Sequence, residues 1–168
     1  MRFEYIYLLC ALLLSGCDSP TSTPNPLSIH NNGLGAIHAD TPFKLHEIES
    51  KLRSYRVESY SASPNSKNKS LMRVSHAKRD VAYISTYSHA KEHADVDEII
   101  VVSDIVTTPF KTKIGKPRES GDIFTCQEHQ KHLLCTSANH GNLSAVFQMN
   151  ADREWILEEI VWSSHAKN

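Results

Sequence analysis

An amphipathic helical pattern is the first regular feature of the chain beyond its N-terminal region. Four apolar side chains between residues 45 and 55 fall within about 80° of one another on a helical wheel. Thr41 or Asp40 can cap the start of this helix, and Pro42 suits its first turn. The pattern therefore predicts an amphipathic helix that buries one face. The four side chains are Leu45, Ile48, Leu52 and Tyr55.

From residue 57 onward the hydrophobic pattern takes the period of β-strands. Short stretches rich in β-branched and aromatic residues are separated by polar turns. Residues 142–149 alternate as a half-buried strand does, whereas 155–162 is apolar on both faces, which predicts a central strand. We expect one domain of the α+β class, with the N-terminal amphipathic helix packed on a mainly antiparallel β-sheet. Further strands are expected at 57–62, 71–76, 81–87, 98–103, 123–127 and 133–137.

The stretch 107–121 interrupts this pattern. Pro109, Gly115, Pro117 and Gly121 occur too often for one long element. The tripeptide Thr-Pro-Phe at 41–43 recurs at 108–110, within this stretch. Two tripeptides are poor evidence for an internal duplication.

Residues 1–16 have the layout of a secretory signal peptide. A basic Arg2 precedes an apolar stretch at 5–14, which is too short for the roughly 20 residues of a membrane-spanning helix. The box Leu14-Ser15-Gly16-Cys17 that follows is typical of bacterial lipoproteins, which are cut before a lipidated cysteine. We expect Cys17 to become an N-terminus that holds the protein at a membrane through its acyl chains. An ordinary signal with a chance cysteine is the alternative.

The next residues predict a tether and a location. Residues 17–32 contain mostly Ser, Thr, Pro and Asn, with almost nothing to bury, so we expect a disordered tether followed by a periplasmic domain at 33–168. Asp18 comes directly after the lipidated cysteine. In enterobacterial-type sorting, an aspartate there tends to keep a lipoprotein on the inner membrane. The outer membrane remains the alternative location in the cell envelope.

The charge pattern excludes some partners. The chain has 18 Lys and Arg against 19 Asp and Glu, a formal net charge of -1. It has no basic stripe of the kind that binds nucleic acid, so no nucleic-acid partner is expected. No run of like charges argues for a second, electrostatic membrane contact, and the lipid on Cys17 is the membrane link that we expect.

Two cysteines remain for the folded domain once the signal is removed and Cys17 is acylated. In an oxidising compartment the default state of Cys126 and Cys135 is a disulfide. The same stretch places His129 and His132 between them at steps of three, which offers four zinc-ligand types as an alternative. Steps of three alternate between the faces of a strand, so paired strands here would prevent the four side chains from converging.

A second zinc pattern is formed by His89, Glu92 and His93. It matches the His-x-x-Glu-His motif of inverted zinc peptidases, in which two histidines hold zinc and the glutamate activates water. That motif needs a helix with a buried apolar stripe, whereas the preceding 81–87 alternates like a strand and the flanks are polar. We therefore expect a solvated loop there, and no catalytic, metal or cofactor site elsewhere.

Several short motifs together resemble the RpoE-regulated lipoprotein family, which comprises envelope lipoproteins named for sigma-E stress control. The resemblance implies an α+β domain, a Cys126 to Cys135 disulfide and no assigned catalytic residue. This chain departs from the family between 115 and 126, where members carry a longer, more helical stretch. The matching positions are 33–37, 41–43, Ile105, 113–115, Cys126, Cys135 and 159–162.

The sequence thus predicts a non-enzymatic envelope lipoprotein that binds a protein or glycan component of the envelope. An inhibitor of a lytic enzyme such as lysozyme is the alternative, because a small disulfide-bonded, β-rich domain suits that role. A zinc-dependent hydrolase at His89, Glu92 and His93 is the third hypothesis.

Overall fold

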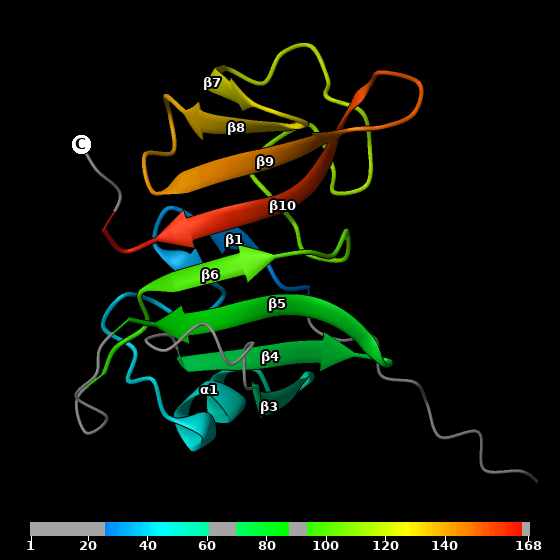
Figure 1. Cartoon of the computed structure of the whole chain (residues 1–168). Coiled ribbons are helices and arrows are strands. Elements are labelled where there is room, and N and C mark those ends of the chain that lie inside the picture. The colour runs from blue at the N-terminus through cyan, green and yellow to red at the C-terminus, as the bar shows by residue number, and fades with distance from the viewer. Residues whose placement is uncertain (1–25, 61–69, 88–93, 166–168) are drawn as a thin grey trace, which may run out of the picture.

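A computed structural model describes residues 26–60, 70–87 and 94–165 of the chain. Eight strands form one antiparallel sheet in the spatial order β3-β4-β5-β6-β10-β9-β8-β7, and two short strands pair separately (Figure 1). The bounds are β1 Ile29–His30, β2 Gly33–Leu34, α1 Leu45–Lys51, β3 Arg56–Tyr60, β4 Ser70–His76, β5 Arg79–Thr86, β6 Glu98–Val101, β7 Phe124–His129, β8 His132–Ser137, β9 Leu143–Met149 and β10 Trp155–Ser163.

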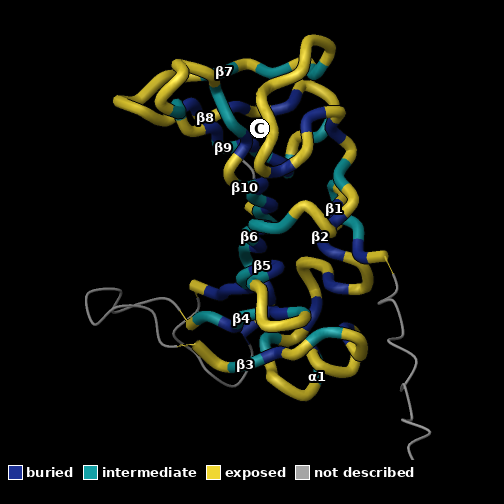
Figure 2. Tube along the Cα trace, turned by 90° about the vertical axis from the view of Figure 1, so that its right-hand side faces the viewer, coloured by how far each residue is buried: buried dark blue, intermediate teal, exposed yellow. Residues whose placement is uncertain are grey.

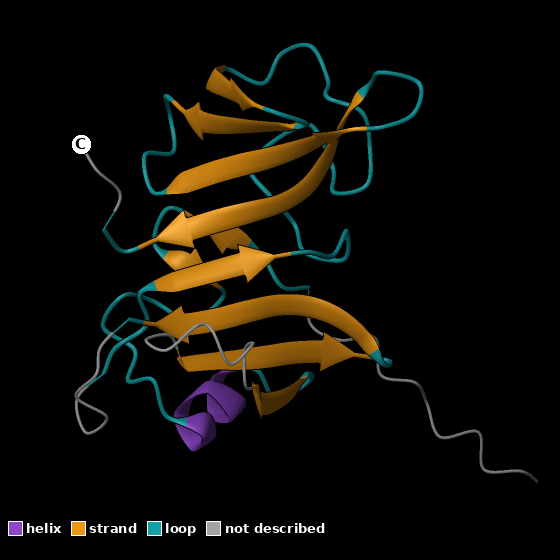
Figure 3. Cartoon of the chain, viewed as in Figure 1, coloured by secondary structure: helices purple, strands orange, loops and turns teal. Residues whose placement is uncertain are grey.

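The expected strands are confirmed, but the expected α+β class is wrong. The described residues contain a single helix, α1, of seven residues, so the domain is mainly β and the helix does not form a layer over the sheet (Figure 3). The helix lies at the β3 edge and buries Ile48 there. Strand β10 lies between β6 and β9, as its two apolar faces predicted.

The helix is shorter than expected at both ends. It ends at Lys51, so Leu52 and Tyr55 of the expected apolar face lie outside it, and Leu45 is exposed. At its start, the residues expected to begin it are extended. The N-cap is Lys44, which makes no side-chain capping bond, while the hydroxyl of Thr41 accepts the backbone N–H of His38 at 2.9 Å. Pro42 forms an antiparallel β-bridge with Asp95, which lies just before β6. Backbone pairing with residues near 95 thus holds 41–43 in an extended conformation. The spacing of apolar residues along 45–55 could not predict this long-range contact.

One face of the sheet carries the hydrophobic core. Alternate residues of the strands belong to it, and the segment 105–118 contributes further buried side chains. The β1–β2 pair lies on that side of the sheet, and α1 lies beside its β3 edge (Figure 2). Burial of apolar surface on this single face is the main stabilising contribution. Its largest fully buried side chains include Trp162, Phe147, Ile48, Ile84, Ile99, Leu143, Leu157 and Ile160.

The sheet consists of two four-stranded meanders that meet where β6 pairs with β10. Adding 61 to the residue numbers of the β5–β6 pairs gives the β9–β10 pairs, since Ala82 then corresponds to Leu143 and Val101 to Trp162. The two halves therefore repeat the same strand arrangement about a pseudo-twofold relation. The matching pairs are Ala82–Val101 and Ile84–Ile99 in one half, and Leu143–Trp162 and Ala145–Ile160 in the other.

The recurring Thr-Pro-Phe tripeptide does not mark this repeat. In the first half, the N–H of Phe43 bonds to the carbonyl of Ala94 at 2.7 Å. The equivalent bond in the second half runs from Arg118 to Trp155 at 2.9 Å, and 94 and 155 again differ by 61. Structurally, 41–43 thus corresponds to 116–118. The shared feature is a proline that bridges to equivalent positions, Asp95 near the start of β6 and Ile156 at the start of β10.

The folded domain begins earlier than residue 33. Leu27 and Ile29 are buried, although they lie in the segment expected to be a tether. The carbonyl of Asn31 accepts the indole N–H of Trp162 at 2.7 Å and the amide of Asn142 at 3.0 Å. These contacts attach the start of the fold to the centre of the sheet, so the tether that we expect is shorter than 17–32.

Gly33 offers a test of the turn that closes this N-terminal segment. Its φ is 134°, and an added Cβ would collide with the carbonyl oxygen of Ile37. We expect Gly33→Ala to lower the free energy of unfolding by at least about 2 kcal/mol, because backbone strain and a backbone collision combine. Urea denaturation of the purified chain measures this change.

Gly141→Ala is the matched control, because nothing lies within 4 Å of a Cβ added at Gly141. We expect its free energy of unfolding to change by less than about 1 kcal/mol. Equal losses in both variants would contradict the proposed turn.

Candidate functional site

Several residues singled out from the sequence lie outside the described part of the chain. Cys17 is one of them, and His89, Glu92 and His93 are the others. Within the described ranges, no group of three or more His, Cys, Asp and Glu residues could hold a metal ion. No helix there is long and apolar enough to cross a membrane.

The Cys126 to Cys135 disulfide is confirmed. The two residues are direct partners on β7 and β8, with Cα atoms 4.0 Å apart. Counting from the two-residue turn places them at a non-hydrogen-bonded pair, where opposite Cα atoms approach most closely. His129 and His132 face each other at the end of the hairpin. With both cysteines oxidised, the zinc pattern of this stretch is not available.

Three adjoining hollows run along the other end of the molecule, around α1, β3 and the β4–β5 turn. The first has a volume of about 270 Å³ and reaches from Pro26 to Tyr55. The second, of about 630 Å³, shares Arg53 and Tyr55 with it. The third, of about 240 Å³, shares Arg56 and Glu58 with the second. Neighbouring hollows thus share lining residues.

Five cations line these hollows, and we call them the basic band. They face three carboxylates, so the lining carries a net charge of +2 with His46 neutral, in a chain whose formal net charge is -1. The remainder of the chain is therefore net negative. The cations are Lys51, Arg53, Arg56, Arg73 and Lys78, and the carboxylates are Glu49, Glu58 and Asp80.

Glu58 lies between two arginines of the band. One of its carboxylate oxygens lies 2.6 Å from a guanidinium nitrogen of Arg56, and the other lies 2.8 Å from a guanidinium nitrogen of Arg73. The hydrogen bond from Arg73 contributes most to holding the pKa of Glu58 below its usual range, with the charge of Arg56 adding to it. Glu58 thus stays ionised and positions the two arginines, with its negative charge directed toward them.

Asp80 is held in a similar way by Tyr83 and Arg73. The Tyr83 hydroxyl donates to Asp80 at 2.5 Å, and a guanidinium nitrogen of Arg73 lies 3.9 Å from the other carboxylate oxygen. The Arg73 guanidinium also lies 5.9 Å from the ring centre of Tyr60. The hydrogen bond to Asp80, together with burial, raises the pKa of Tyr83 to about 12. Tyr83 therefore stays neutral and acts only as a donor.

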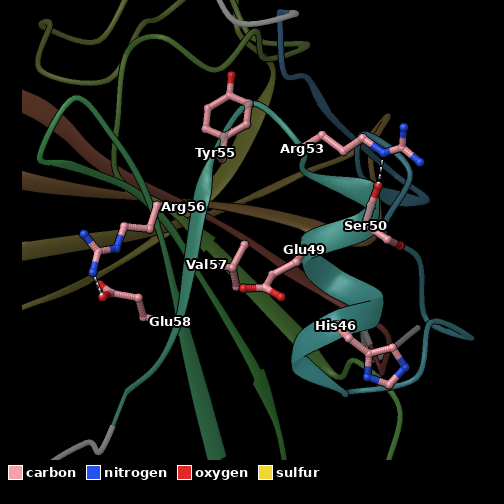
Figure 4. Close-up of a pocket in the computed structure, with 8 residues that line it drawn as sticks. All are labelled: His46, Glu49, Ser50, Arg53, Tyr55, Arg56, Val57 and Glu58. Carbon is pink, nitrogen blue, oxygen red and sulfur yellow. Dashed lines mark hydrogen bonds and ion pairs between the residues drawn. The ribbon is translucent and has the colours of Figure 1, made fainter.

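Lys51 and Arg53 differ from the other cations of the band. Both are exposed, and in the described ranges neither makes an ion pair. The Nε of Arg53 donates to the carbonyl of Ser50 at 3.3 Å, which leaves the rest of its guanidinium open to solvent. Figure 4 shows Arg53 extending from the end of α1, away from Glu49 and from the Arg56–Glu58 pair.

The arrangement suits the binding of negative charge. Arginine and lysine side chains bind carboxylates and phosphates through charge-assisted hydrogen bonds. No nucleophile with an adjacent base accompanies them among the lining residues. Sequence reasoning missed the band because its five cations are separated by two to seventeen positions and form no charge run.

Comparisons with known proteins define the fold and leave the function open. No family model matches the chain, and no curated protein matches it. Among solved structures, the chain is similar to the uncharacterized protein yfeY from Escherichia coli, with a TM-score of 0.62 and 19% sequence identity over 81% of this chain and 99% of that one. At this identity, the similarity shows a shared fold alone.

The disulfide should stabilise the β7–β8 hairpin at the edge of the sheet. The cysteines are 9 residues apart, and in the chain-entropy model a loop of this size contributes about 2.5 kcal/mol to the free energy of unfolding. We therefore expect dithiothreitol to lower that free energy by about this amount in denaturant titrations. The double variant Cys126→Ala, Cys135→Ala is the control, and it should not respond to the reductant.

The pKa of Tyr83 tests the geometry around Asp80. Asp80→Asn removes the acceptor charge, so the pKa of Tyr83 should fall from about 12 toward its ordinary value. NMR titration of ring-labelled tyrosines measures it. Asp152→Asn, in the exposed turn between β9 and β10, should leave it unchanged. An unaltered Tyr83 titration in Asp80→Asn would show that the hydrogen bond is not formed in solution.

Proposed function

We propose that the chain is a lipid-anchored envelope protein whose periplasmic domain binds an envelope component without catalysing a reaction. The observation that carries the binding role is the basic band, because it is an accessible group of cations on the side of the domain where the chain enters the fold. The anchor itself is proposed from the box that ends at Cys17.

The disulfide supports a periplasmic location. Disulfides persist in oxidising compartments and are rare in the reducing cytosol. A short distance in sequence also suits the anchor, since the described fold begins with Leu27 buried ten positions after Cys17. Membership of the RpoE-regulated lipoprotein family and attachment at the inner membrane, as Asp18 indicates, are parts of the same proposal.

The contacts of the site favour binding over catalysis. Catalytic sites bring a nucleophile, a base and charge-stabilising donors to one point. Here Glu58 is occupied by two arginines and Asp80 by a tyrosine, so the carboxylates hold neighbouring side chains in place. With the exposed Glu49 included, the lining still carries a net charge of +2.

Fractionation of cells expressing Cys17→Ser tests the anchor. Without the thiol no lipid can be attached, so we expect the protein to leave the membrane fraction and to appear with soluble periplasmic proteins. Immunoblots of the membrane and soluble fractions measure the distribution. Membrane retention as strong as that of the wild type would overturn the proposed anchor.

The double variant Cys126→Ala, Cys135→Ala is the matched control for loss of cysteine. It removes the disulfide and lowers stability, but it keeps the lipidated residue. We expect it to stay in the membrane fraction, which would assign the change of location to Cys17 alone.

A further inference from the structure

We infer that the basic band is the surface by which the domain lies against the anionic headgroups of the bilayer that holds its lipid. This inference rests on the proposed function, because it takes Cys17 as the anchored residue. The proposed binding partner of the band is a phospholipid surface. No pattern in the sequence indicated this partner.

The length of the chain before the fold keeps the domain close to the bilayer. Pro26, which lines the first hollow, lies nine positions after Cys17. Even fully extended, this segment covers only about 30 Å. Pro26 therefore stays within that distance of the lipid, and it lines the same hollow as Lys51 and Arg53. Tethering at this range raises the effective concentration of headgroups at the band to the order of millimolar or more.

The charges of the band suit an anionic surface. Lys51 and Arg53 are exposed, and the Arg56 side chain is 76% exposed although it is paired with Glu58. The carboxylate of Glu58 is turned toward its arginines, and that of Asp80 toward Tyr83. Glu49 is also exposed, so the lining carries a net charge of +2 rather than cations alone, while the remainder of the chain is net negative. A negative membrane surface would attract this face and repel the rest.

The spread of the cations favours a surface over one small anion. They come from the end of α1, from β3, from β4 and from the β4–β5 turn, and they line three successive hollows. One phosphate or carboxylate cannot contact all of them. A layer of headgroups presents many negative charges, and each lysine or arginine near such a surface strengthens binding about fivefold.

Vesicle sedimentation tests the inference without the lipid anchor. The chain from residue 17 onward with Cys17→Ser retains every described residue, and it is mixed with vesicles of phosphatidylcholine alone or of phosphatidylcholine with phosphatidylglycerol. We expect binding to the mixed vesicles only, and a loss of that binding as salt is raised. Adding Lys51→Gln and Arg53→Gln should weaken it by about 25-fold, or fivefold for each charge.

The control pair is Lys113→Gln with Lys131→Gln, which removes the same charge from the half of the molecule that contains β7–β10. We expect this pair to bind mixed vesicles almost as well as the parent chain. Equal weakening by both pairs, equal binding to both vesicle types, or no binding to either would overturn the inference. So would sedimentation with purified peptidoglycan but not with mixed vesicles, which would assign the band to a glycan.

The lipidated chain gives a second readout in the same vesicles. Amide hydrogen exchange at 50–58 should slow in mixed vesicles relative to phosphatidylcholine, and unchanged exchange would argue against docking by this face. Fractionation of Cys17→Ser reports on the anchor alone, whereas sedimentation reports on the band alone. Failure of the proposed anchor and failure of the proposed surface are therefore distinguishable.

Discussion

The antiparallel pairing of β6 with β10 is the contact on which the rest of the structure depends. Each strand ends a four-stranded meander, and their register, with Val101 opposite Ile160 and Ile99 opposite Trp162, joins the two meanders into one sheet. The four side chains are buried on the same face. Because the strands lie some sixty residues apart in sequence, forming this pair closes a long loop, and its burial must offset the loss of chain entropy.

Other long-range contacts are made to residues of this pair of strands or next to it. Trp162 continues the buried row of β10 and donates its indole N–H to Asn31, which fixes the N-terminal segment across the core. Pro42 bridges to Asp95 just before β6, and Pro117 bridges to Ile156 at the start of β10. The repeat of these contacts in the two halves explains how segments that lack regular structure come to cover one face of the sheet.

The basic band is a product of the same frame. The arginines at 53, 56 and 73 become neighbours because β3 pairs with β4 and because α1 lies at the β3 edge. Glu58 and Asp80 then orient the guanidinium of Arg73, which also contacts the ring of Tyr60. An exposed group of cations next to the point where the chain enters the fold gives the domain one face that differs electrostatically from the others.

Local patterns determined much of this protein. Alternation predicted β9, the two apolar faces of 155–162 predicted the central place of β10, and the two remaining cysteines predicted the disulfide. The strands follow from the order of apolar and polar residues close together in the sequence. The disulfide follows from the oxidising compartment that the signal peptide predicts. The tertiary structure decided the shortened helix, the correspondence of Pro42 with Pro117, the earlier start of the fold at Leu27 and the basic band. Each of these depends on backbone pairing or charge proximity between segments far apart in the chain, and residue periodicity carries no information about such distances.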